Sequence, residues 1–127
     1  MYEDKLILFV DDDTNITTLY SSVFSHAGFN YQIAHNALQA EQLIKTKKPH
    51  LLLLDIMLPD KNGLEILREI KADPETQGIM VWMLSNLGDI DTRTKASELG
   101  ASEYIIKAQF TPNQVVERIK QYLDNGS

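Results

Sequence analysis

Short apolar runs alternate along the chain with longer segments in which apolar residues recur at helical spacing. Five runs are typical of strands: 6–10 (LILFV), 29–34 (FNYQIA), 51–55 (LLLLD), 79–84 (IMVWML) and 103–107 (EYIIK). The runs at 51–55 and 79–84 are apolar almost throughout, which indicates strands buried on both faces. The run at 29–34 is more polar and fits the edge of a sheet.

The segments between these runs carry the signals of helix starts and ends. We expect helices over 14–27, 36–47, 64–70, 89–99 and 111–123. Asn36 and the capping box from Thr111 to Gln114 mark two starts, whereas Gly28 and Gly100 mark two ends. This alternation predicts an α/β fold, a (βα)5 doubly wound sheet of five parallel strands in the flavodoxin-like order 2-1-3-4-5.

Polar side chains with reactive chemistry follow four of the expected strands. They are Asp11, Asp12 and Asp13 after the first strand, Asp55 at the end of the third, Ser85 after the fourth and Lys107 at the end of the fifth. Ligands of such sheets bind beyond the carboxyl ends of the strands, so we expect these side chains at one edge. We interpret Asp13 as a helix cap and the others as a site.

The aspartates at this edge need charge compensation. Two unit charges about 4 Å apart repel by roughly 4 kcal/mol at an effective dielectric near 20. Either some carboxyls take up protons, or a cation lies among them. Oxygen ligands without histidine or cysteine suit Mg²⁺, with Mn²⁺ or Ca²⁺ as substitutes. An aspartate nucleophile, a metal, a lysine and a hydroxyl are the components of phosphoryl transfer onto a carboxylate.

Length, composition and charge narrow the class of protein. A chain of 127 residues predicts one domain over 1–127, with its core at about 4–124. There is no cysteine, so disulfides and thiolate metal sites are excluded. The net charge of -6 argues against direct nucleic-acid binding, and no apolar run is long enough for a membrane span or a signal peptide. We therefore expect a cytoplasmic protein.

Four motifs, in order, give the chain a resemblance to the receiver domains of response regulators. They are FVDDD after the first strand, LLLLDIMLP around Asp55, MLSN with Ser85, and GASEYIIK with Lys107. The resemblance covers essentially the whole chain. It implies that Asp55 accepts a phosphoryl group from a phosphohistidine on a sensor histidine kinase or a histidine phosphotransfer protein. It also implies a signalling protein of two-component or phosphorelay systems, not an enzyme.

For the metal, the resemblance implies that Asp12, Asp55 and the main-chain carbonyl of Met57 bind Mg²⁺ directly. Asp11 would help through a water molecule. By the same match, Met57 and Leu87 border the path by which water approaches the phosphorus. Both side chains are apolar and cannot orient that water, so we expect slow self-dephosphorylation.

For the phosphoryl group, the resemblance implies that Ser85 hydrogen-bonds it and that Lys107 pairs with it. Tyr104 would turn inward on activation. We expect the switching surface at the helix over 89–99 and the neighbouring fifth strand. The reason is that this helix has few large apolar anchors, so its packing is easier to shift.

Two positions differ from the usual pattern of the family. Ala108 follows the lysine, where the family usually has a proline joined through a cis bond. A cis bond before any other residue costs about 2.5–4 kcal/mol, so we expect a trans bond between Lys107 and Ala108. Asn86 follows Ser85, where the family prefers a very small residue. Its side chain either narrows the approach to Asp55 or contacts the phosphoryl group.

Three other functions fit parts of the sequence. FVDDDTN comes close to the DxDx(T/V) motif of haloacid-dehalogenase-type phosphatases, in which Asp11 would be the nucleophile, but Asn15 replaces the expected Thr or Val. A flavodoxin-like FMN carrier is disfavoured, because three aspartates would repel the nucleotide phosphate. The third alternative is a receiver-shaped binding module that never becomes phosphorylated.

Because the chain ends soon after the last expected helix, we expect no DNA-binding or catalytic output domain within these residues. We expect either a stand-alone receiver or a piece of a longer regulator or hybrid kinase. A stand-alone receiver would act through a protein partner or through a dimer formed on phosphorylation.

Overall fold

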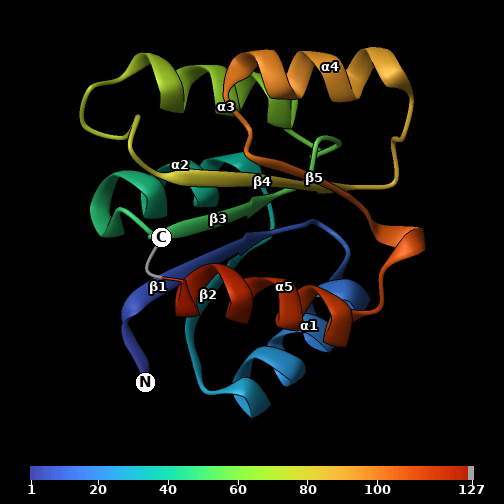
Figure 1. Cartoon of the computed structure of the whole chain (residues 1–127). Helices are drawn as coiled ribbons and strands as arrows, with labels where there is room; N and C mark the ends of the chain where they lie inside the picture. The colour runs from blue at the N-terminus through green and yellow to red at the C-terminus, as the bar shows by residue number, and fades with distance from the viewer. Residues whose placement is uncertain (126–127) are drawn as a thin grey trace.

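The computed structural model describes residues 1–125 and contains five strands and five helices (Figure 1). The strands are β1 (Tyr2–Val10), β2 (Phe29–Ala34), β3 (Leu51–Leu54), β4 (Met80–Ser85) and β5 (Glu103–Ile106). The helices are α1 (Thr14–Ala27), α2 (Ala37–Lys47), α3 (Gly63–Ala72), α4 (Ile90–Leu99) and α5 (Pro112–Asp124), with a 3₁₀ turn, η1 (Lys107–Gln109). All strand pairs are parallel, in the order β2-β1-β3-β4-β5. The predicted fold class and strand order are confirmed.

The register of the sheet brings the ends of four strands to one level. The pairs nearest the carboxyl edge are Val10–Leu54, Leu54–Met83 and Ser85–Ile106. Asp11 and Asp55 each follow one of these paired residues directly, as does Lys107. The polar side chains predicted to share an edge therefore start from adjacent strand ends.

Two layers of core side chains cover the faces of the sheet. The aliphatic layer lies under α2, α3 and α4 and includes Leu8, Val10, Leu52, Leu54, Ile66, Leu67, Val81 and Met83. The aromatic layer lies under α1 and α5 and includes Tyr2, Phe9, Tyr20, Phe24, Phe29 and Trp82. Figure 1 shows α1 and α5 together on one side of the sheet and α3 and α4 on the other. Because β3 contributes to both layers, its four leucines are completely buried, which explains its uninterrupted apolar sequence.

The predicted helix caps are present in the structure. The Asp13 side chain accepts a hydrogen bond from the Asn15 main chain at the start of α1, as expected of a cap. Asn36 caps α2, and Thr111 forms the capping box of α5 with Gln114. Asp89 caps α4 in the same way and so lies just outside that helix. Each cap fixes where the preceding loop leaves the edge of the sheet.

The first strand is longer than predicted, because β1 begins at Tyr2 and not at Leu6. Residues 3–5 are polar, so the pattern of apolar residues did not predict this extension. Tyr2 pairs with Phe29 across an irregularity in the register, and their rings meet edge to face at 5.2 Å. The Tyr2 hydroxyl also donates to Asp124 at 3.0 Å, so long-range contacts stabilise this segment.

The fifth strand is shorter than predicted. Pairing with β4 stops at Ile106, and Lys107 begins the η1 turn instead of ending the strand. Turn formation redirects the chain toward α5, and the Phe110 N–H donates to the Lys107 carbonyl. None of the peptide bonds within residues 1–125 is cis, so the bond between Lys107 and Ala108 is trans, as predicted. No helix in this part of the chain has the length and apolar character needed to cross a membrane.

Candidate functional site

Three carboxylates gather at the carboxyl edge of the sheet. Asp11, Asp12 and Asp55 each offer one oxygen, and these three oxygens lie within 4.8 Å of one another. Asp11 and Asp55 are buried, with 1% and 6% of their surface exposed, whereas Asp12 is exposed. A set of three carboxylate oxygens, open to solvent on one side, is able to bind a divalent metal ion.

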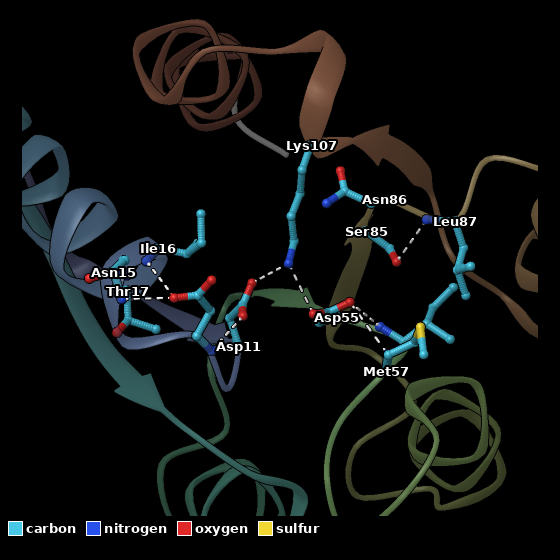
Figure 2. A network of polar contacts seen from close by, with 12 residues as sticks. Asp11, Asn15, Ile16, Thr17, Asp55, Met57, Ser85, Asn86, Leu87 and Lys107 are labelled. Atoms are coloured by element: carbon cyan, nitrogen blue, oxygen red, sulfur yellow. Dashed lines mark hydrogen bonds and ion pairs between the residues drawn. The ribbon is translucent and has the colours of Figure 1, made fainter.

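Lys107 extends into this cluster from the end of β5, whereas Asp11 and Asp55 follow β1 and β3. Its ammonium group donates a hydrogen bond to Oδ2 of Asp11 and another to Oδ2 of Asp55, the latter at 3.0 Å (Figure 2). The lysine side chain is itself largely buried. One positive charge thus lies between two buried carboxylates, and it offsets the repulsion that the sequence predicts for them.

Burial and this ion pairing act in opposite directions on the protonation of the site. Burial raises the pKa of the Asp11 carboxyl, and hydrogen bonds from Lys107 and from the Asp13 main chain offset only part of that rise. For Lys107, burial alone would lower the pKa, but the hydrogen bonds to Asp11 and Asp55 outweigh it and hold the pKa above its usual value. Lys107 is therefore a fixed positive charge at neutral pH.

Asp55 is oriented by the loop that follows it. Its Oδ1 atom accepts hydrogen bonds from the main-chain N–H groups of Ile56 at 2.7 Å and Met57 at 3.4 Å. The loop then folds back, because the Gly63 N–H donates to the Ile56 carbonyl at 2.7 Å and Met57 forms an isolated bridge with Asn62. The loop between β3 and α3 is thus a closed turn that fixes the carboxylate and places the Met57 main chain beside it.

Gly63 is required by this closed turn. A Cβ atom at position 63 would lie 2.0 Å from the main-chain oxygen of Asp55, far closer than any atomic contact allows. Asn62 and Gly63 form no hairpin; Asn62 caps α3 and Gly63 is its first residue. The glycine therefore lets α3 approach the strand end that carries Asp55.

Ser85 and Tyr104 meet at the loop between β4 and α4. Ser85 is buried, and its Oγ atom accepts a hydrogen bond from the Leu87 N–H at 3.3 Å. The Tyr104 hydroxyl donates to the Leu87 carbonyl, and the tyrosine ring is half-buried. The Arg93 guanidinium from α4 lies 5.8 Å from the centre of that ring. Tyr104 therefore links β5 to the segment that carries Ser85.

The two predicted water-access residues differ in their surroundings. Met57 has 66% of its surface exposed, whereas Leu87 is half-buried and packs against the aliphatic layer. Figure 2 shows both side chains on the side of Asp55 away from Asp11. Neither carries a group that could orient a water molecule.

Three contacts around the site have no signal in the sequence. Asp60 accepts hydrogen bonds from the main-chain N–H groups of Ala37 and Leu38, which lowers the pKa of its carboxyl and ties the loop after β3 to α2. Lys61 forms ion pairs with Glu41 of α2 and Glu69 of α3. The third contact joins the Asn86 side chain to the Ala108 main chain. All three connect residues more than seven positions apart, so no local pattern predicts them.

The fold and this cluster define a class of protein: a doubly wound α/β sheet with three carboxylates and a lysine at its carboxyl edge. Comparison with known proteins gives the family. Residues 7–120 match the response regulator receiver domain, and the chain belongs to that family. It is a signalling module of two-component systems and not a catalytic enzyme, and receiver domains of this kind have sensor kinases as partners.

Relatives support this placement along almost the whole chain. The phosphate regulon transcriptional regulatory protein PhoB of Pseudomonas aeruginosa is 39% identical over 119 residues, which are 94% of this chain and 52% of that protein. The chain spans about half the length of its curated relatives. A CheY-like receiver domain protein from Methanospirillum hungatei has 30% identity and a TM-score of 0.86, with 95% of this chain and 94% of that one covered.

A third relative bears on the metal. The Mn²⁺-bound form of response regulator Rcp1 has 27% identity and a TM-score of 0.82, and the match covers 94% of each chain. The donors present here fit such an ion, because all three are carboxylate oxygens close enough to share one cation. Lys107 occupies only the Oδ2 atoms of Asp11 and Asp55, and Asp12 faces solvent.

The close approach of Gly63 to Asp55 gives a testable prediction. Gly63→Ala should lower the free energy of unfolding by about 1–3 kcal/mol, because the strand end or α3 must shift to admit the added methyl group. Gly78→Ala is a matched control: a Cβ there meets nothing within 4 Å, so its effect should stay below about 1 kcal/mol. Urea denaturation measures both. Equal stability of the two variants would contradict the close contact.

Proposed function

We propose that this chain is a phosphoacceptor receiver in which Asp55 takes a phosphoryl group from a phosphohistidine. The observation that carries the proposal is the position of the Lys107 ammonium between Asp11 and Asp55 within the three-carboxylate cluster. A carboxylate oxygen of Asp55 attacks the phosphorus, so an O–P bond forms while the N–P bond of the donor breaks. The electron pair of the broken bond stays on the imidazole nitrogen, which takes up a proton.

The residues around Asp55 divide this work. Lys107 pairs with the phosphoryl oxygens, and Ser85 hydrogen-bonds one of them. Asp12, Asp55 and the main-chain carbonyl of Met57 would hold Mg²⁺, with Asp11 helping through water. The ion, when bound, supplies positive charge that offsets the charge of the phosphoryl oxygens during transfer.

The central prediction concerns where the phosphoryl group goes. Incubation with Mg²⁺ and acetyl phosphate should add one phosphoryl group to the protein, seen by intact-mass spectrometry. Asp55→Asn should abolish the addition, and chelation of the metal should do the same for the unaltered protein. Asp91→Asn, an equivalent change at an exposed aspartate of α4, should leave labelling unchanged. Labelling that persists in Asp55→Asn would refute the role of Asp55.

The phosphatase alternative puts the covalent phosphate on Asp11. The burial of Asp11 disfavours it, because 1% of its surface is exposed against 6% for Asp55, so a phosphoryl donor reaches Asp55 more easily. The oxygens of both aspartates accept hydrogen bonds, so hydrogen bonding does not separate the two alternatives. Peptide mapping of the labelled protein separates the two functions, since each names a different aspartate.

The wider biology follows from the receiver assignment. We propose that residues 1–127 form one receiver domain that works in the cytoplasm. A sensor histidine kinase or a histidine phosphotransfer protein supplies the phosphoryl group. The signal passes to a protein partner, to an output domain or to a dimer formed on phosphorylation, and not to nucleic acid directly.

We propose that the switching surface comprises α4, β5 and the loop between β4 and α4. Ala96 is the only buried residue of α4, and Ile90 is 79% exposed. The longer helix α5, in contrast, buries Val115, Val116, Ile119 and Leu123. Tyr104 and Ser85 both contact Leu87 at the start of this surface, so a phosphoryl group that attracts Ser85 also disturbs the partner of Tyr104.

Hydrogen exchange tests this surface. Amides of α4 should exchange faster than those of α5, because few buried contacts resist local opening. Phosphorylation should alter exchange in α4 and β5 while leaving α5, the control helix, nearly unchanged. Equal protection of the two helices in both states would contradict the proposed surface.

We also propose that self-dephosphorylation is slow, because apolar Met57 and Leu87 border the approach of water. The double substitution Met57→Asn with Leu87→Glu should accelerate phosphate loss by about 10²-fold, the lower range for positioned acid–base groups. The lifetime of radiolabelled phosphoprotein measures the rate. Leu38→Asn, at an exposed leucine of α2, serves as the control. An unaltered protein that already loses phosphate as fast as the double variant would overturn this account.

A further inference from the structure

Asn86 lies between Ser85 at the end of β4 and Lys107 after β5, the two residues whose side chains are proposed to bind the phosphoryl group. It follows Ser85 directly in the chain, and its Oδ1 atom accepts a hydrogen bond from the Ala108 N–H at 3.1 Å. Ala108 in turn follows Lys107. The Asn86 side chain therefore spans from the end of β4 to the η1 turn after β5 (Figure 2).

The contact with Ala108 fixes which way the amide faces. A main-chain N–H can only donate, so the amide oxygen must face Ala108 and the NH₂ group must face the other way. Figure 2 shows the amide nitrogen on the side of the Lys107 side chain. Among the described residues, none accepts a hydrogen bond from this NH₂ group.

The proposed partners of a phosphoryl group on Asp55, which are Lys107, Ser85 and the metal ion, leave room for a further hydrogen-bond donor. The phosphoryl group carries three terminal oxygens with strong acceptor capacity. The Lys107 ammonium already gives two of its three N–H bonds to Asp11 and Asp55, and Ser85 has a single hydroxyl proton. A further neutral donor at the rim, held in orientation before the group arrives, strengthens binding at little entropic cost.

We infer that Asn86 is a further phosphoryl-binding residue, which the Ala108 N–H orients so that its NH₂ group donates to an oxygen of the phosphoryl group on Asp55. This inference rests on the proposed function of Asp55. It also accounts for two unusual residues together, because a proline at 108 would have no N–H for the amide oxygen, and a smaller residue at 86 would have no amide.

Binding of trifluoroberyllate, a non-covalent mimic of the phosphoryl group, tests the inference. With Mg²⁺ present, ¹⁹F NMR reports the bound fraction. Asn86→Ala should weaken binding about tenfold, the usual effect of one hydrogen bond to a charged group. The affinity of the same variant for Mn²⁺ alone should stay within about twofold of the unaltered protein, since Asn86 is not among the three clustered carboxylates.

A second variant separates donation from the contact with Ala108. Asn86→Asp keeps an oxygen for the Ala108 N–H but replaces the NH₂ group with a charged acceptor. Gln109→Glu adds the same charge at an exposed neighbour and serves as the control. Asn86→Asp should weaken trifluoroberyllate binding at least fivefold more than Gln109→Glu does.

Either of two results would overturn the role of Asn86 while leaving the proposed function of Asp55 intact. In the first, Asn86→Ala binds trifluoroberyllate as tightly as the unaltered protein. In the second, Asn86→Asp weakens trifluoroberyllate binding no more than Gln109→Glu does. In the second case only the contact with Ala108 would matter. Failure of the unaltered protein to bind trifluoroberyllate in the presence of Mg²⁺ would overturn the proposed function of Asp55, and the role of Asn86 with it.

Discussion

Two buried carboxylates share one ammonium group at the carboxyl edge of the sheet, and the arrangement of the site follows from that shared charge. Asp11 and Asp55 start from neighbouring strands in register, so they cannot move apart without breaking the sheet. Removing one member of such a buried group leaves an uncompensated charge, which is more costly than never burying the group. The η1 turn carries Lys107, so its position is constrained by the need to keep the ammonium group within reach of both carboxylates.

Much of this arrangement could be predicted from local sequence. The leucines of β3, the Asp13 and Asn36 caps and the capping box at Thr111 each act over a few residues, and the structure confirms them. The rule that ligands bind beyond the carboxyl ends of parallel strands then predicted that the aspartates and Lys107 lie close together. What the residues do in phosphoryl transfer remains a prediction, because geometry alone does not report chemistry.

The features that sequence reasoning missed are long-range. The extension of β1 to Tyr2 depends on contacts with Phe29 and Asp124, which no periodicity near residue 2 reveals. Lys107 forms a turn instead of ending a strand, because pairing with β4 runs out at Ile106. Asp60 accepts a hydrogen bond from the first residue of α2, which lies 23 positions earlier in the chain, and no local sequence pattern predicts that contact. Such contacts are set by the assembled fold.

The loop after β3 and the loops after β4 and β5 hold the site in different ways. The first is closed by the contact of Gly63 with the Ile56 carbonyl, and Asp60 and Lys61 tie it to α2 and α3. The other two are joined to each other through exposed Asn86 and Ala108 and through half-buried Tyr104. Asp55 thus stands on the half of the site that is tied to α2 and α3, whereas Ser85 and Lys107 stand on the half that Asn86 and Tyr104 hold together.

The two core layers make the faces of the sheet mechanically unequal. In the aromatic layer, the buried Phe24 ring lies 5.6–5.9 Å from four other rings, and each such pair favours particular angles. The aliphatic layer contains no such interlocked rings, and small side chains, Ala37, Ala40 and Ala96, line its helices. A displacement of α4 therefore needs only aliphatic side chains to repack, whereas a displacement of α1 would disturb the ring contacts around Phe24.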